Sequence, residues 1–172
     1  VCDGTDAAMR TAEPAAGQYP VESVEQLANI VREPEHAEEP TLDGDFTNKT
    51  FRRIDQSIAM GALFTAHHLG CKAIIALTES GSTALWMSRH RIHVPIFALT
   101  ARDVAQRKMA LFRNVHPLLV PSYAGRDEAL RQAETFLVER GLLRPGDTYA
   151  ITCGEPMGRP GGTNMLKVCA VP

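Results

Sequence analysis

Hydrophobic positions along the chain follow two kinds of spacing from residue 52 onward. Short continuous apolar runs, typical of buried strands, occur at residues 73–77, 95–99, 116–120, 149–152 and 166–171. Helical spacing lies between the first four, at residues 83–91, 103–112 and 126–140. A further helical surface precedes them and ends at Gly70; its apolar members are Ile54, Ile58, Met60, Ala62 and Leu63. This alternation predicts an α/β fold, a three-layer α/β/α domain with a mostly parallel five-stranded sheet.

The last apolar run follows the one before it without an intervening helix. We therefore expect residues 166–171 to pair antiparallel at an edge of the sheet, because a parallel crossover needs a longer connection.

The beginning of the chain has a different pattern. A strand-like stretch at residues 6–9 is followed by a turn and by an amphipathic helix at residues 21–33. One strand and one helix cannot cover both faces of that strand, so we expect residues 1–36 to belong to a larger unit. Residues 34–49 are acidic, contain prolines and show no period, as linkers do. We assign residues 37–50 to the linker and residues 51–172 to the following domain.

Composition excludes several classes of protein. The chain has 172 residues, 44% of them hydrophobic, and its 18 basic and 20 acidic residues give a net charge of -2. Such a balance provides no general attraction to nucleic acid or to anionic membranes. No stretch approaches the roughly 18 apolar residues of a membrane span, and the first residues lack the pattern of a signal peptide. We expect a soluble, cytoplasmic protein.

The four cysteines, at positions 2, 71, 153 and 169, contain no C-x-x-C pair. This spacing favours free buried thiols in a reducing compartment over a disulfide or metal framework. His67, His68 and Cys71 could face one another as metal ligands, but no second ligand pair follows at zinc spacing. Packed or surface histidines are the favoured interpretation.

Candidate chemistry lies first in a loop between a buried strand and a helix, with the sequence TESGST. The loop consists of Thr78, Glu79, Ser80, Gly81, Ser82 and Thr83. A glycine permits a sharp turn, while hydroxyl groups and the unpaired N–H groups of a helix start suit a phosphate. The alternative is structural, because serine and threonine are also ordinary helix caps.

A second loop at residues 153–163, CGEPMGRPGGT, follows another strand of the same parallel sheet and should emerge at the same edge. It is long and rich in glycine, which favours a functional role. Its candidate binding residues are Arg159, which supplies a cation, and Pro160, Gly161, Gly162 and Thr163. The chain contains no G-x-G-x-x-G, P-loop or G-x-S-x-G motif, so dinucleotide binding, P-loop chemistry and hydrolysis have no support.

These motifs, in this order, resemble one known family. The stretch from IDQSIAMGALFTAHHLG through TESGSTALWMSR to PIFALT, followed by MALFRNVHPLLV and RGLLRPGDTYAITCGEPMGRPGGTNMLKV, is similar to pyruvate kinase. The resemblance includes the N-terminal DGTDAAM and covers nearly the whole chain.

The resemblance implies that residues 1 to about 36 are the last strand and helix of a catalytic (β/α)₈ barrel. The rest would be a complete C-terminal allosteric domain, which in this family binds a phosphorylated effector with the two loops. The family enzyme transfers a phosphoryl group from phosphoenolpyruvate to ADP with Mg²⁺ and K⁺, usually as a homotetramer. Most of its catalytic residues lie outside this stretch. We therefore expect a fragment that contributes effector binding and subunit contacts, holds neither metal and is inactive alone.

Departures from the family pattern refine these expectations. Thr11 and Glu13 keep polar groups at the possible edge of an active site, but Arg10 and Pro14 differ from the usual residues. Glu79 stands where some members have lysine, and its carboxylate would repel a second phosphate. A sugar monophosphate or AMP is therefore expected rather than a bisphosphate.

Arg131 falls where some members of the family place a phosphate-binding arginine. A free-standing domain that binds a small phosphorylated metabolite is the alternative to a fragment of the enzyme. A purely structural module that only forms oligomers is a third interpretation.

Overall fold

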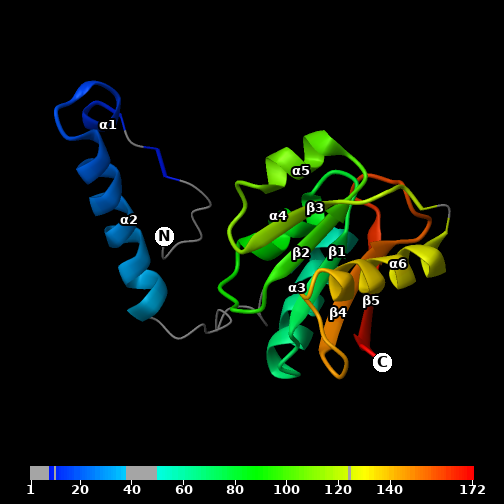
Figure 1. Cartoon of the computed structure of the whole chain (residues 1–172). Helices are drawn as coiled ribbons and strands as arrows, with labels where there is room; N and C mark the ends of the chain where they lie inside the picture. The colour runs from blue at the N-terminus through cyan, green and yellow to red at the C-terminus, as the bar shows by residue number, and fades with distance from the viewer. Residues whose placement is uncertain (1–7, 10, 38–49, 124) are drawn as a thin grey trace.

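The computed structural model describes residues 8–9, 11–37, 50–123 and 125–172 (Figure 1). Its helices are α1 (Glu13–Ala16), α2 (Pro20–Ala37), α3 (Ile54–His68), α4 (Ser82–Ser88), α5 (Asp103–Met109) and α6 (Arg126–Glu139). Its strands are β1 (Ala73–Leu77), β2 (Ile96–Thr100), β3 (Val115–Leu119), β4 (Thr148–Gly154) and β5 (Thr163–Ala170). From α3 onward, helices and strands alternate as the hydrophobic pattern predicts.

The five strands form one sheet in the order β3-β2-β1-β4-β5. The strands β1 to β4 run parallel to one another, with Ile74 of β1 opposite Ile96 on one side and Ala150 on the other. The last strand, β5, pairs antiparallel with β4 at the edge. The structure therefore confirms both the mostly parallel sheet and the antiparallel final strand. All residues of β1 and β2 are buried, as expected for central strands covered on both faces.

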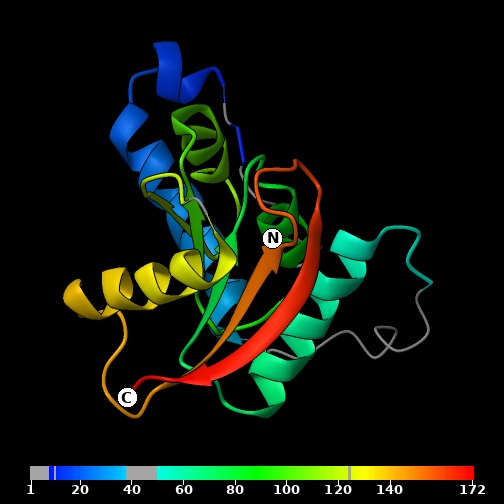
Figure 2. The same cartoon turned by 90° about the vertical axis from the view of Figure 1, so that its right-hand side faces the viewer.

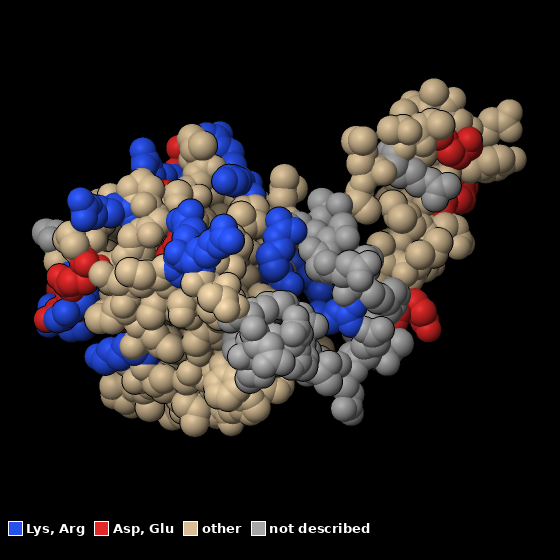
Figure 3. Space-filling model, turned by 180° about the vertical axis from the view of Figure 1, so that it is seen from behind, with Lys and Arg blue, Asp and Glu red and all other residues tan. Residues whose placement is uncertain are grey.

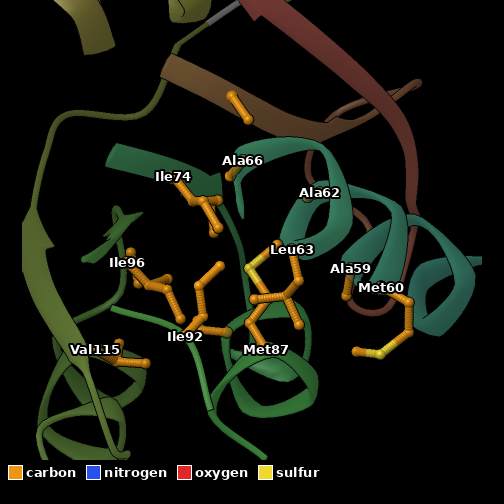
Figure 4. Packing of buried hydrophobic residues seen from close by; sticks show 14 of the residues in the cluster. Ala59, Met60, Ala62, Leu63, Ala66, Ile74, Met87, Ile92, Ile96 and Val115 are labelled. Carbon is orange, nitrogen blue, oxygen red and sulfur yellow. The ribbon is translucent and has the colours of Figure 1, made fainter. Parts of the chain in front are cut away.

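Helices cover the two faces of the sheet unequally (Figure 2). Residues of α3, α4 and α5 join one apolar cluster with the strands, and its members Leu63, Met87 and Ile96 are fully buried (Figure 4). On the opposite face, α6 contributes Ala129, Ala133 and Leu137 to a second cluster. This arrangement is the expected three-layer α/β/α domain, with α6 as the helix of its second face.

Two hairpin strands differ from their predicted bounds. The run at residues 149–152 belongs to a longer strand, 148–154, and the last strand begins at residue 163 instead of 166. Backbone pairing continues past the apolar residues, with Cys153 opposite Met165 and Gly154 opposite Thr163. Hydrophobic pattern could not reveal this extension, because ladder hydrogen bonds do not require apolar side chains.

Two helices end earlier than predicted, α4 at residue 88 instead of 91 and α5 at 109 instead of 112. In α4, the Ser88 hydroxyl donates to the Leu85 carbonyl at 2.9 Å. After α5, Asn114 has a φ of 55°, and its amide donates to the carbonyls of Ile92 and Val94 at 2.9 Å each. This side chain fixes the turn before β3, so the chain leaves the helix early.

The N-terminal elements α1 and α2 pack on each other and lie outside the sheet layers (Figure 1). A short helix, α1, stands where we expected only a loop, and α2 continues to Ala37 instead of ending at 33. Residues 8 and 9 are not in a strand, and the rest of the stretch predicted at 6–9, together with linker residues 38–49, lies outside the described residues. On α2, Val21 and Ile30 are more than 60% exposed.

Candidate functional site

The carboxyl ends of β1, β2, β3 and β4 meet at one edge of the sheet, because these strands are parallel. The chain passes from β1 to β2 on one side, whereas β4 lies on the other side of β1. Ligands of open α/β sheets bind at such a switch point. Two connections flank it: residues 78–83 after β1, here called the first rim loop, and residues 155–162 after β4, the second rim loop.

Gly81 shapes the first rim loop. Its φ is 81°, a left-handed conformation that glycine adopts without strain, and its N–H donates to the Thr78 hydroxyl at 3.0 Å. A Cβ at this position would lie 2.7 Å from Cγ of Met109. The glycine is therefore required both by the turn and by close packing against α5. Since α4 has only seven residues, its dipole is that of a short helix. An anion bound here would therefore have to be held mainly by hydroxyl and N–H groups of the loop itself.

The hydroxyl groups of the first rim loop have different surroundings. Thr83 and Thr163 are buried, and their hydroxyl oxygens lie 2.6 Å apart, so they bind each other and join α4 to β5. By contrast, the buried hydroxyl oxygen of Ser82 has no hydrogen-bond partner among the described residues. Buried hydroxyls are usually paired. Of these predicted site residues, Ser82 therefore retains a binding group, whereas the two threonines hold the rim together.

The second rim loop is shorter than the predicted stretch 153–163, since its ends belong to the hairpin strands. Asn164 fixes its start: its side-chain oxygen accepts from the Glu155 N–H at 2.9 Å, and its amide donates to the Glu155 carbonyl at 2.7 Å. Farther along, the Gly162 N–H donates to the Arg159 carbonyl at 3.0 Å and closes a turn around Pro160 and Gly161. This loop is tied to the sheet at both ends.

A small space of about 30 Å³ separates the two loops. Thr78 and Glu79 line it from the first loop, and Gly158, Arg159 and Gly161 line it from the second. Thr163 also lines this space, so the structure brings together five of the eleven predicted loop residues there. The other predicted loop residues do not line it: Ser80, Gly81, Ser82, Thr83, Pro160 and Gly162.

Beside this space lies a larger hollow of about 290 Å³, here called the rim cavity. Residues from four strand ends line it: Leu77, Thr78, Glu79, Leu99, Thr100, Ala101, Val120, Pro121, Ser122, Tyr123, Gly125, Arg126, Glu155, Pro156, Met157 and Gly158. A neighbouring cleft of about 750 Å³ shares Glu79 and adds Ser80, Arg102 and Lys108. Small-molecule pockets measure roughly 300–1,000 Å³, so the rim cavity suits a small ligand.

Ser122, Tyr123 and Arg126 were absent from the predicted site. The sequence pattern could have indicated these residues, because the segment between β3 and α6 also follows a parallel strand and must reach the same edge of the sheet. Burial raises the pKa of the Tyr123 hydroxyl, and the Glu128 charge adds to that effect. The phenol is therefore neutral and can donate a hydrogen bond.

Arg126 is the cation in the lining of the rim cavity, which also contains the carboxylates Glu79 and Glu155. Its Nη1 lies 3.0 Å from Glu155, and its Nε donates to Asp127 at 2.8 Å. The hydrogen bond and charge of Asp127, with the charge of Glu155, raise the pKa of Arg126. Arg131, the predicted contact, is 74% exposed on α6, pairs with Glu128 and lines none of the cavities described above.

Glu13 and Thr11 lie in the N-terminal part. The Glu13 carboxylate accepts a hydrogen bond from the Tyr19 N–H at 2.8 Å and so stabilises the turn between α1 and α2. Thr11 is exposed. Within the described residues, no three His, Cys, Asp or Glu side chains are grouped to hold a metal ion.

The sequence favoured free thiols and packed or surface histidines, and the described cysteines and the histidines of α3 agree with this. Cys71 and Cys153 are buried free thiols, and Cys169 is free and partly buried; Cys2 lies outside the described residues. His68 packs against Phe64 with ring centroids 4.3 Å apart and against His67 at 5.0 Å.

Charge on the surface is dispersed. On the face shown in Figure 3, lysine and arginine side chains form several separate groups with uncharged surface between them. No helix in the described part of the chain is long and apolar enough to cross a membrane.

The chain is thus an α/β domain with a cavity at the carboxyl edge of its sheet, and comparison with known proteins identifies its family. Residues 56–169 match the family described as pyruvate kinase, alpha/beta domain. The chain belongs to the pyruvate kinase family.

Curated relatives agree with this assignment. The chain is 37% identical to pyruvate kinase of Buchnera aphidicola subsp. Baizongia pistaciae and 38% identical to pyruvate kinase II of Salmonella typhimurium, each over 99% of this chain and 36% of the relative. It is 38% identical to pyruvate kinase of Staphylococcus epidermidis over 98% of this chain and 29% of the relative. The chain therefore spans about a third of the length of these relatives and matches their C-terminal part.

Proposed function

We propose that this chain is the regulatory C-terminal part of a pyruvate kinase and that it binds a phosphorylated effector in the rim cavity. The observation that carries the proposal is the meeting of the two rim loops at the switch point of the sheet, with a cavity of about 290 Å³ beside them. The Arg126 guanidinium lines this cavity and Arg159 lines the small space beside it, so both can reach a phosphate there. The buried, unpaired Ser82 hydroxyl lies in the adjoining first rim loop and lines neither space. The tyrosine and serine hydroxyls of the cavity would bind the rest of the ligand.

Charge favours a ligand with one phosphate. The rim cavity contains one arginine and two carboxylates, Glu79 and Glu155. A second phosphate near either carboxylate would be repelled. A sugar monophosphate or AMP is therefore the proposed effector class, in preference to a bisphosphate.

The remaining proposals concern the whole enzyme. The complete protein would transfer a phosphoryl group from phosphoenolpyruvate to ADP with Mg²⁺ and K⁺ in the cytoplasm, as a homo-oligomer with contacts through the C-terminal domain. Residues 1–36 would be the end of the catalytic barrel, and residues 37–50 a linker to the regulatory domain, 51–172. Phosphoryl transfer requires positioned metals and cationic groups, which one barrel strand cannot assemble. We expect no turnover by the isolated chain in a coupled assay with pyruvate detection.

Calorimetric titration of the chain with ribose 5-phosphate, AMP and fructose 1,6-bisphosphate tests effector binding. We expect one of the monophosphates to bind most tightly, and Ser82→Glu to abolish its binding by adding a carboxylate to the first rim loop that repels the anion. Because the Ser82 hydroxyl oxygen is buried, the glutamate should also lower the stability of the domain, so a thermal melt must show that the variant is folded before its titration is compared with wild type.

Ser57→Glu is the matched control, because Ser57 is exposed in the first turn of α3. It should leave binding unchanged. If Ser82→Glu binds as tightly as wild type, the first rim loop is only a helix cap. If the wild type binds none of the ligands, the chain is a structural module instead.

A further inference from the structure

The ion pair between Arg126 and Glu155 joins the start of α6 to the first residue of the second rim loop. Nη1 of Arg126 lies 3.0 Å from Oε2 of Glu155, and both side chains line the rim cavity. The arginine of the cavity is therefore already paired with a carboxylate of the protein itself. A ligand that uses this arginine must compete with that carboxylate.

We propose that Glu155 is a specificity-determining residue that acts as an internal competitor for the anion site. Its carboxylate holds Arg126 in the free protein, and the phosphate of a ligand displaces it. The inference rests on the proposed function, since it takes anion binding in the rim cavity as its starting point. The exchange replaces one ion pair with another and changes no covalent bond.

Arg126 is oriented for such an exchange. Its Nε donates to Asp127, the next residue of the same helix, at 2.8 Å, so the contact of Nε is separate from the contact of Nη1 that changes partner. A guanidinium presents several N–H groups in one plane and binds phosphate through two of them. Arg126 can therefore receive a phosphate without first leaving its position.

Glu155 is held in a way that lets its carboxylate leave. Its backbone N–H and carbonyl are both bound by the Asn164 side chain, at 2.9 and 2.7 Å. The side chains of Arg126 and Glu155 are 40% and 54% exposed, and exposed ion pairs are weak because water and salt screen them. The carboxylate can thus swing into solvent while the backbone of the loop stays anchored.

This competition selects among anions. A ligand carboxylate offers Arg126 the same charge and the same acceptor atoms as Glu155. Displacing Glu155 therefore yields such a ligand little binding free energy. A phosphomonoester carries close to two charges and three acceptor oxygens, and displaces Glu155 with a net gain. The structure therefore favours phosphomonoesters over carboxylates at this arginine.

Ribose 5-phosphate binding by the full chain, measured by calorimetry at fixed ionic strength, tests the inference. Glu155→Gln keeps the size of the side chain and the backbone contacts with Asn164, and should bind roughly twofold to fivefold tighter than wild type, as expected for an exposed ion pair. Arg126→Gln should weaken binding by more than about tenfold. The double variant should bind ribose 5-phosphate with the same affinity as Arg126→Gln alone, because the cation for which Glu155 and the phosphate compete is gone.

Glu139→Gln controls for net charge, because Glu139 is exposed at the far end of α6. It should bind as wild type does. If the wild type binds but Glu155→Gln does not bind more tightly, Glu155 does not compete with the phosphate, and the proposed function still stands. The same holds if Glu155→Gln raises the affinity equally in the presence and in the absence of Arg126. If neither the wild type nor Glu155→Gln binds any phosphate ester, the proposed function fails, and this inference fails with it.

Discussion

Single residues position the rim loops through contacts that reach across the fold. Gly81 supports the first loop, where a side chain would meet Met109 of α5. Asp55, 1% exposed at the start of α3, accepts hydrogen bonds from Arg53 at 2.9 and 2.7 Å. The same guanidinium lies beneath the second loop, where a Cβ at Gly161 would lie 2.8 Å from it. Both rim loops thus depend on single residues for their shape.

Replacing Gly81 with valine should destabilise the domain. A β-branched residue is strained at a φ of 81°, and its side chain would overlap Met109. Strain and overpacking together predict a loss of about 2 kcal/mol or more in the free energy of unfolding, measured by urea denaturation. Gly125→Val is the matched control, because Gly125 has open space around it and no positive φ. Equal stability of the two variants would contradict the role of Gly81.

Asp55→Asn should destabilise the protein in a pH-dependent way. Burial tends to raise the pKa of Asp55, but the hydrogen bonds and charge of Arg53, together with the hydrogen bond from the Gln56 N–H, outweigh burial and lower the pKa overall. The ionised carboxylate therefore stabilises the fold above about pH 4, and this contribution is lost as pH falls through the lowered pKa.

Urea denaturation at pH 7 and pH 3 measures this effect. At pH 7 the variant should lose about 1–3 kcal/mol, and the gap to wild type should narrow at pH 3. The control is Asp103→Asn, which removes an exposed ion pair with Arg107 and should change stability little. A gap that stays constant between the two pH values would rule out the ionised pair as its source.

At the scale of elements, the rim is held by α4, β5 and α6. The Thr83–Thr163 hydrogen bond joins α4 to β5, and the Arg126–Glu155 pair joins α6 to the second rim loop. The first contact is buried and the second is partly exposed. We therefore expect the threonine hydrogen bond to persist when a ligand binds, and the ion pair between Arg126 and Glu155 to break and re-form.

A double-mutant cycle on Thr83 and Thr163 checks that fixed contact. Each single change to valine leaves one buried hydroxyl without its partner, and should cost about 1–3 kcal/mol in the free energy of unfolding. The double variant should be more stable than the sum of the two changes predicts, because neither hydroxyl remains. Strict additivity would show that the two threonines do not interact.

At the scale of the whole molecule, the N-terminal helices differ from the sheet domain. The apolar positions Val21, Val24 and Ile30 of α2 are exposed, and the chain spans about a third of the length of its relatives. An apolar helix face normally packs against a neighbouring layer. In the complete enzyme we expect the remaining barrel to supply that layer.

Amide hydrogen exchange of the isolated chain should show this difference. Amides of α2 should exchange much faster than those of α3 and β1, because few buried contacts oppose local opening of α2. The measurement should be made on a sample shown to be monomeric, and β1 serves as the internal control. Slow exchange throughout α2 in that sample would contradict the expectation.

From residue 52 onward, the order of elements and the type of sheet could be read from the sequence, and so could the family. Apolar runs of four to six residues separated by helical periods allow few arrangements other than a mostly parallel sheet. Glycine at position 81 and the glycines of the second rim loop also indicated where the chain turns sharply. These features depend on local spacing and on backbone freedom, both of which are visible in the order of residues.

Which side chains share the site depends on how distant segments fold together. Thr83 and Thr163 are 80 residues apart and pair with each other, whereas Arg126, missed in the sequence, lines the cavity in place of Arg131. The extra length of β4 and β5 and the position of α1 were equally hidden. Packing decides which distant segments form hydrogen bonds with each other and in which direction a side chain leaves its helix. No local pattern of residues records that packing.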